Sequence, residues 1–379
     1  MYRIALKMLL ADKAKYLMLV SALSFASMMM AQQAGIFIGI MLWTTSLLPN
    51  TQAKIWVVDP KVEHLNDVKP IRDIDLYRVR SVKGVSWAVP LIQVVQQARL
   101  ADGTFKLVLL IGVDPTSLIG IPQKVLKGNL EDLHQANGVV IEEWAVKKLV
   151  SPKFPPLTVG DIFEINDHEA RVVAIVRGER SFFGIPFVYT TYDRAIEIAP
   201  YTRKSMSFVL AEPAPGESAE AVARRIEAAT GLKARTYDEM FWDTIWWYFK
   251  NTGLPVGFGT TVLLGFIVGI AVSGQIFYLY VLENLRFLGA FKAMGATNST
   301  LAKMLYLQSF TVGLIGFGIG MVITSIFAYF TLQVGEPPFY MPWQVLLFIF
   351  LSILFICAFS AYIGIRKISK LEVAEVFRD

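Results

Sequence analysis

The chain has 379 residues, of which 54% are apolar and only 18% are charged. Its mean hydropathy of +0.49 is too high for an ordinary soluble domain and excludes a disordered chain. The single cysteine, Cys357, excludes an intramolecular disulfide, and the three histidines are too far apart in the sequence to predict a metal site.

Four long stretches without charged side chains contain the apolar excess. Each of them predicts one transmembrane helix, because a membrane span needs about 20 apolar residues. The first is longer than the apolar region of a signal peptide, so we expect it to be retained as a span. They lie between Lys15 and Lys54, Lys250 and Glu283, Lys303 and Glu336, and Glu336 and Arg366, and hold 38, 32, 32 and 29 residues.

The stretches divide the chain into segments, and the predicted fold class follows from their order. We expect a membrane α-helical protein with four transmembrane helices and a large α+β extracytoplasmic domain inserted between helices 1 and 2. In chain order the segments are a cytoplasmic amphipathic helix, span 1, the inserted domain, span 2, a cytoplasmic connecting helix, span 3, a short outer turn with span 4, and a cytoplasmic tail: 1–15, 16–48, 49–250, 251–282, 283–303, 304–335, 336–365 and 366–379.

The basic residues predict how the chain is oriented. The three segments 1–15, 283–303 and 366–379 hold 11 basic and 5 acidic residues, whereas the rest of the chain holds 25 and 26. Cytoplasmic loops of membrane proteins carry an excess of Lys and Arg, so we expect both termini on the cytoplasmic side of a bacterial inner (plasma) membrane. Topology therefore explains the pI near 9.1, and no nucleic-acid partner is expected.

Alternating apolar and polar residues predict a β-rich inserted domain. The strongest signal is a hairpin in which Val85–Leu100 and Thr104–Gly112 are joined by Ala101-Asp102-Gly103. Ser218 predicts the N-cap of a helix that continues to Ala229. The two ends of the domain are expected to form one subdomain, and residues 114–200 an inserted second one. Further strands are expected at Lys54–Asp59, Phe187–Thr190, Ser205–Ala211 and Lys233–Tyr237, with two strands within Asp161–Arg177 and short helices at Ile71–Val82 and Asp193–Ile198.

An aromatic segment comes directly before the second span. Asp238–Lys250 reads DEMFWDTIWWYFK and holds Trp242, Trp246, Trp247 and Tyr248. Trp and Tyr collect at membrane interfaces, where an apolar ring and a polar edge are both satisfied. We therefore predict an interfacial helix, and a patch that grips a substrate is the alternative.

Small residues recur at four-residue spacing inside the predicted spans. Such spacing lets two helices approach closely, either within one subunit or across a homodimer seam. The positions are Gly35 and Gly39, Gly265 and Gly269, and Gly316 and Gly320.

The link Glu283–Lys303 between spans two and three is amphipathic. Apolar side chains at three-residue spacing predict a short helix, and Gly295 is a natural C-terminal cap. Such a helix is suited to docking a soluble partner, and a connector lying on the membrane is the alternative. The apolar residues are Leu285, Leu288, Phe291 and Met294, with Phe287 beside them.

This link carries a family resemblance. Leu285–Ala296, LRFLGAFKAMGA, resembles the coupling segment of MacB/FtsX/LolC-type ABC transporter permeases, and its closest look is to the DevC-like branch. The order of the segments is similar to the family's layout, and Ile368–Arg378 is similar to its usual ending, with Lys370-Leu371 where a proline is common. The family often has a glutamate where this chain has Phe287, and Glu283 lies one turn earlier.

The resemblance implies a partner and a set of contact residues. The family's permeases form a dimer bound to two copies of a separate ABC ATPase, which holds ATP and Mg. This chain has no P-loop, so we predict that it binds no cofactor itself, has no catalytic residue and is not an enzyme alone. The implied ATPase-coupling residues are Glu283, Leu285, Arg286, Phe287, Leu288, Gly289, Phe291, Lys292, Met294 and Gly295.

The resemblance also implies a function. Such permeases convert ATP-driven closure at the cytoplasmic face into motion of an outer domain with a porter part built from its two ends, which is called mechanotransmission. Our main hypothesis is export of an amphipathic or lipidic substrate, with a periplasmic adaptor, an outer-membrane duct and membrane lipids as further partners. The alternative is an FtsX-like scaffold that signals to a cell-wall hydrolase and transports nothing. A membrane receptor without an ATPase is a third interpretation.

Overall fold

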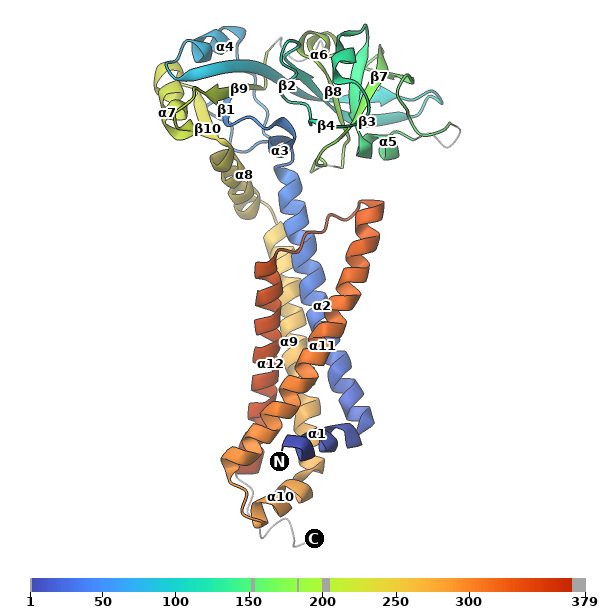
Figure 1. The fold of residues 1–379 in the computed structure, drawn as a ribbon, viewed down its shortest axis with the longest axis vertical. Helices are drawn as coiled ribbons and strands as arrows, with labels where there is room; N and C mark the ends of the chain where they lie inside the picture. The colour runs from blue at the N-terminus through green and yellow to red at the C-terminus, as the bar shows by residue number, and fades with distance from the viewer. Residues whose placement is uncertain (1, 151–153, 183, 200–204, 370–379) are drawn as a thin grey trace. The chain divides into compact units, whose positions relative to one another are not determined.

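The computed structural model describes residues 2–150, 154–182, 184–199 and 205–369 (Figure 1). It divides into two compact units. We call Met1–Ile40 with Gly253–Asp379 the membrane unit, and Met41–Thr252 the α+β unit. Most of the family-like ending Ile368–Arg378 lies outside the described residues.

Long apolar helices make up the membrane unit. Among the described residues, four are long and apolar enough to cross a membrane, which confirms the four predicted spans. They are α2 (Lys13–Thr44), α9 (Leu254–Glu283), α11 (Asn298–Val334) and α12 (Trp343–Ser369). The short helix α1 (Tyr2–Ala11) precedes α2, and α10 (Leu285–Ala293) lies between α9 and α11.

The third span begins earlier than the charge gap predicts. The Thr297 side chain accepts a hydrogen bond from the backbone N–H of Thr300 at 3.3 Å and caps the helix. The helix therefore starts at Asn298 and includes Lys303 in its first turns. Charge gaps mark the part of a helix that lies in lipid, whereas caps mark where the helix itself begins.

A single sheet forms the centre of the α+β unit. Its strand order in the described residues is β10-β1-β9-β2-β3-β8-β5-β7-β4, and β6 pairs with β2 and β7. The strands are β1 (Ile55–Val58), β2 (Val85–Arg99), β3 (Phe105–Val113), β4 (Lys124–Gly128), β5 (Gly138–Glu142), β6 (Ile162–Ile165), β7 (His168–Arg177), β8 (Phe187–Thr191), β9 (Phe208–Pro213) and β10 (Lys233–Thr236).

The predicted hairpin is confirmed. Strands β2 and β3 pair antiparallel from Leu91 opposite Val113 to Arg99 opposite Phe105. In the turn, Asp102 accepts a hydrogen bond from the Thr104 N–H at 2.9 Å, and Gly103 has φ +83°. A positive φ strains residues with a Cβ, so the Asp-Gly pair determines where this chain reverses.

Short helices cover the sheet. The Ser218 prediction is confirmed, since its side chain accepts from the Ala221 N–H at 3.2 Å at the start of α7. The helices are α3 (Leu47–Thr51), α4 (Asp73–Arg80), the 3-10 helix η1 (Leu130–His134), α5 (Glu143–Lys148), α6 (Tyr192–Ile198), α7 (Ala219–Thr230) and α8 (Tyr237–Asn251).

The sheet runs without a break through the region expected as an inserted subdomain. Residues 114–200 supply β4 to β8, and β8 pairs in parallel with β3. The main apolar core is likewise shared, because it joins Trp56 and Phe208 from the two ends of the unit to Val140 and Phe187 from the middle. Figure 1 shows the two groups of strands side by side, linked by the long β2.

Candidate functional site

One face of α10 is anchored on the spans. Leu288 is only 2% exposed, and Leu285 and Phe291 pack against the apolar core of the membrane unit. These three residues lie three positions apart and so form one stripe on the helix. The apolar side of the helix therefore packs on the spans of its own chain.

Gly295 ends this segment through a Schellman motif. Its N–H donates to the Lys292 carbonyl at 3.1 Å, and the Ala296 N–H donates to the Phe291 carbonyl at 2.9 Å. Gly295 has φ +93°, which residues with a Cβ rarely adopt. The glycine therefore fixes the direction in which the chain leaves α10.

The opposite side of α10 is open. Phe287 is 63% exposed and Met294 is 74% exposed, with Arg286 also exposed beside them. The three-residue spacing puts Met294 on one apolar face with Leu285, Leu288 and Phe291, but Met294 is exposed whereas Leu288 is buried. The helix ends at Ala293, so Met294 occupies the cap and turns outward.

A cluster of charged side chains joins the start of α2 to the end of α9. The Lys15 ammonium pairs with the Asp12 carboxylate at 2.8 Å and also with the Glu283 carboxylate. Lys15 belongs to the first turn of α2, and Glu283 is the last residue of α9. Glu283, predicted to contact the ATPase, is thus engaged within its own chain, a contact between residues 268 positions apart that sequence inspection missed.

A second polar residue missed by sequence inspection lies inside the membrane unit. Gln308 of α11 is 2% exposed, and its amide donates to the Ala5 carbonyl at 2.7 Å and to the Tyr280 hydroxyl at 3.0 Å. It therefore connects α1, α9 and α11. A lone glutamine in a long apolar run is the signal that would have found it.

Two of the six predicted packing glycines form a close helix crossing. A Cβ at Gly316 would lie 2.8 Å from the Leu23 Cβ, and one at Gly320 would lie 2.7 Å from the Ser24 carbonyl oxygen and overlap the Ser27 hydroxyl. Helices α11 and α2 therefore touch backbone to backbone here. Gly265 and Gly269 of α9 also face α2, next to Ala26.

The first pair of glycines packs against a loop. A Cβ at Gly35 would lie 2.5 Å from the Phe339 ring, and one at Gly39 would lie 2.7 Å from the Pro338 backbone. The Tyr340 N–H also donates to the Gly35 carbonyl at 3.0 Å. All six glycines therefore face other segments of the same membrane unit.

The aromatic helix α8 has two distinct sides. Trp242, Trp246 and Phe249 are exposed and lie four and three residues apart, which places them on one face. On the other side, Trp247 donates to the Glu63 carboxylate at 2.6 Å, and the buried Tyr248 packs against Phe182.

The four predicted aromatic residues therefore divide. Trp242 and Trp246 face outward, whereas Trp247 and Tyr248 pack on rings of their own unit. The Trp247 ring lies 3.9 Å from the His64 ring, and burial lowers the pKa of that histidine. Trp247 and Tyr248 contact residues that are far away in the sequence, so the sequence of α8 alone does not show which of its aromatic side chains are exposed.

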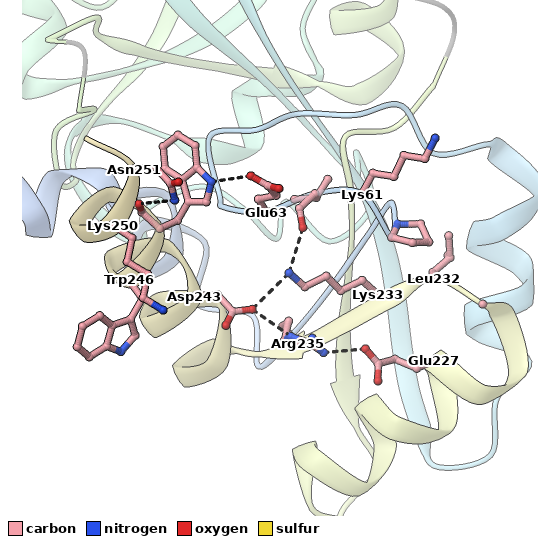
Figure 2. Close-up of a pocket in the computed structure, with 14 residues that line it drawn as sticks. Lys61, Glu63, Glu227, Leu232, Lys233, Arg235, Asp243, Trp246, Lys250 and Asn251 are labelled. Atoms are coloured by element: carbon pink, nitrogen blue, oxygen red, sulfur yellow. Dashed lines mark hydrogen bonds and ion pairs between the residues drawn. The ribbon is translucent and has the colours of Figure 1, made fainter. Parts of the chain in front are cut away.

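A polar groove of about 970 Å³ lies beside α8 (Figure 2). Its centre is an ion-pair network in which Arg235 contacts Glu227 at 2.7 Å and Asp243 at 3.1 Å, and Lys233 contacts Asp243 at 3.3 Å. Lys61 and Lys250 lie on opposite sides of this network (Figure 2).

One acidic side chain is buried in the core of the α+β unit. Glu142, at the end of β5, accepts a hydrogen bond from the Phe187 N–H at 2.9 Å through Oε1, and its Oε2 has no hydrogen-bond partner among the described residues. Burial raises the pKa of Glu142 from 4.5 to about 8, although the Phe187 hydrogen bond and then Arg180 oppose the shift. The described residues hold no group of three or more His, Cys, Asp or Glu that could bind a metal.

Two family models together match most of the chain. The one described as MacB-like periplasmic core domain matches residues 25–229, more than half of the sequence, and the one described as FtsX-like permease C-terminal matches residues 241–373. No curated protein matches the chain.

Solved structures with low sequence identity also match. The extracellular domain of the noncanonic ABC-type transporter YknZ from Gram-positive bacteria has 15% identity and a TM-score of 0.36, covering 48% of this chain and 98% of that one. The periplasmic region of MacB from Actinobacillus actinomycetemcomitans has 14% identity and a TM-score of 0.39, covering 54% and 95%. A domain of a putative permease from Porphyromonas gingivalis has 11% identity and a TM-score of 0.34, covering 50% and 90%.

The two family models fall on the two parts of the molecule that the sequence separates. The MacB-like match covers the second part of the first span and most of the α+β unit, and the FtsX-like match contains the other three spans and α10. The chain is therefore a multi-pass membrane protein that belongs to the MacB/FtsX-type ABC transporter permeases.

Proposed function

We propose that this chain is the permease subunit of an ABC exporter that works by mechanotransmission. Permeases of this family work with an ABC ATPase. In our proposal the ATPase is a separate subunit that holds ATP and Mg, and both termini of the permease lie on its side, in the cytoplasm. Hydrolysis moves the α+β unit on the outer side of the membrane.

The observation that carries this proposal is the two-sided α10. Leu288 and its neighbours hold the helix on the spans, while Phe287 and Met294 extend into solvent. Exposed large apolar side chains on an anchored helix are suited to a partner's pocket. A push on α10 would therefore pass into the spans rather than bend a flexible loop.

The Lys15–Glu283 pair supports transmission to the α+β unit. Helix α2 leads into that unit and α9 follows it in the chain, so these two spans carry its connections. Their other ends are joined by this ion pair, directly beside Leu285, where α10 begins. A displacement of α10 would thus act on both connections together.

The further parts of the proposal concern assembly and cargo. We propose a homodimer with two ATPase subunits, of the DevC-like kind, with a periplasmic adaptor and an outer-membrane duct. The charge gaps within the spans support an amphipathic or lipidic substrate, because a path for an ion needs charged or polar groups in the membrane. ATP-driven export by the reconstituted complex tests this part.

Phe287→Lys is expected to abolish co-purification of the ATPase with the full chain in mild detergent. An ammonium group at the centre of an apolar contact costs several kcal/mol, which corresponds to at least about a hundredfold weaker binding. The control is Phe105→Lys, which makes the same change at a residue of similar exposure, 61% against 63%, on β3.

The pull-down has outcomes that decide the proposal. If no ATPase is recovered with the wild type, or if both variants retain it equally, α10 is not the coupling site. A membrane-fusion adaptor in the wild-type eluate would support export, whereas a cell-wall hydrolase would overturn export in favour of signalling.

Lys15→Glu is expected to leave the ATPase bound but to remove the effect of ATP on hydrogen exchange in the α+β unit. The substitution replaces an attraction to Glu283 by repulsion, so α2 and α9 lose their link. The double variant Lys15→Glu with Glu283→Lys restores opposite charges and is expected to restore the response. A wild-type response in Lys15→Glu would contradict this role.

A further inference from the structure

We propose that the groove beside α8 binds anionic phospholipid headgroups in the leaflet that faces the α+β unit. The inference concerns the protein at rest and does not depend on the ATPase. It is based on three observations: the short link between the groove and the second span, the exposed aromatic face of α8, and the lysines at the rim of the groove.

The groove is tethered close to the membrane. Lys250 and Asn251 line it, and Leu254, four residues after Lys250, is the first residue of the apolar helix α9. A chain extends by at most about 3.6 Å per residue, so Lys250 lies within about 14 Å of the start of the span. A headgroup layer is about 5–8 Å thick, so this limit keeps Lys250 within about two such thicknesses of the start of the span.

The wall of the groove has the side chains of an interfacial helix. Trp246 lines it, and with Trp242 and Phe249 it forms the exposed face of α8. Tryptophan is enriched at the level of headgroups because its ring is apolar and its N–H can donate. A soluble anion such as free phosphate would need no such face, so the aromatic residues favour a lipid.

The charges of the groove favour an anionic lipid. Lys233 and Arg235 are neutralised by Asp243 and Glu227, and the Glu63 carboxylate accepts the Trp247 N–H. The ammonium groups of Lys61 and Lys250 form no ion pair with any described residue, and Lys250 lies only 5.9 Å from the Trp246 ring centre.

The groove is lined by four basic and three acidic residues, so its net charge is +1, and Lys61 and Lys250 lie on opposite sides of it (Figure 2). This excess positive charge matches the phosphate of an anionic headgroup. Basic residues near an anionic bilayer contribute about 1 kcal/mol each, which is roughly a fivefold effect on binding per lysine.

The test is hydrogen exchange of the full chain in nanodiscs, made of phosphatidylcholine alone or mixed with phosphatidylglycerol. We expect amide exchange in α8 to slow by about fivefold or more when phosphatidylglycerol is present, and this slowing to vanish in Lys61→Glu/Lys250→Glu. The control, Lys124→Glu/Lys127→Glu, reverses two exposed charges on β4 and is expected to behave as wild type. Exchange in β2 and β3 verifies that each variant is folded.

Three results would overturn the proposal. One is equal exchange of α8 in the two bilayers. Another is a lipid effect that the groove variant retains as fully as the β4 control. The third is equal slowing in phosphatidylcholine nanodiscs on adding free phosphate, which would assign the site to a soluble anion.

Discussion

Gly320→Leu is expected to destabilise the membrane unit by about 3 kcal/mol, the upper part of the usual range for overpacking. The position has no room for a side chain, because a Cβ would overlap the Ser27 hydroxyl and lie 2.7 Å from the Ser24 carbonyl oxygen. The hydroxyl can rotate away, but the backbone of α2 must move. The closest crossing of α2 and α11 would therefore open.

Cys357 offers a direct measurement of this effect. It is the only cysteine of the chain and is 1% exposed in the core of the membrane unit, so a maleimide dye reacts with it only on unfolding. We expect Gly320→Leu to lower the temperature at which Cys357 becomes reactive. The control is Gly318→Leu on the same helix, where nothing lies within 4 Å of the added Cβ. Equal effects of the two substitutions would contradict a tight crossing.

Glu142→Gln is expected to change how the stability of the α+β unit depends on pH. Burial raises the pKa of Glu142 from 4.5 to about 8 in the folded protein. Between these values the folded state holds one proton more than the unfolded state, so stability falls as the pH rises. The limiting slope is about 1.4 kcal/mol per pH unit, and the loss between pH 5 and pH 8 is on the order of 4 kcal/mol.

Glutamine at this position carries no titrating proton and retains an oxygen to accept the Phe187 N–H. We therefore expect the variant to be more stable than wild type at pH 8, and the advantage to shrink towards pH 5. Denaturant unfolding of the full chain, followed by tryptophan emission at several pH values, measures it. His64, whose pKa is lowered, contributes in the opposite direction, but its effect cancels in the difference between the two proteins.

Glu143→Gln is the matched control. This neighbouring carboxylate is about half exposed and pairs with Arg177 at 3.0 Å, so its removal is expected to leave the slope of wild type. If Glu142→Gln and wild type show parallel pH curves, Glu142 is ionised in the folded protein and the assigned effect of burial is wrong.

Local signals explain what could be predicted from the sequence. Charge gaps located the four spans, because a charged side chain is costly in lipid over the whole length of a helix. The turn at Asp102-Gly103 and the cap at Ser218 also act within a few residues, and both occur where expected.

Features that depend on distant partners could not be predicted. The sequence of a strand does not show which strand it pairs with, because the partners are far apart in the chain. The positions of β8 beside β3 and of β9 between β1 and β2 could therefore not be predicted. The same holds for the site. Sequence spacing puts Met294 on one apolar face with Leu288, and only the end of the helix at Ala293 separates the exposed Met294 from the buried Leu288.

The partners of individual side chains follow the same rule. The family resemblance implies that Glu283 contacts the ATPase, and its ion pair with Lys15 cannot be read from the segment, because Lys15 is at the other end of the chain. Trp247 and Tyr248 were placed with the outward tryptophans because His64 and Phe182, against which they pack, are far away in sequence.

The pairing of β1 with β10 has a mechanical consequence. The chain enters this pair at Ile55 and leaves it at Thr236, and these two residues lie opposite each other. A hydrogen bond from the Tyr237 N–H to the Lys54 carbonyl, at 2.9 Å, closes the pair at the same end. Pulling the two connections apart would unzip the strands one bond at a time, the weakest direction for a β ladder. If both connections move in the same direction, the hydrogen bonds between β1 and β10 bear no force. The α+β unit would therefore follow a motion that both connections share, and its β1–β10 pair would open if only one of them moved.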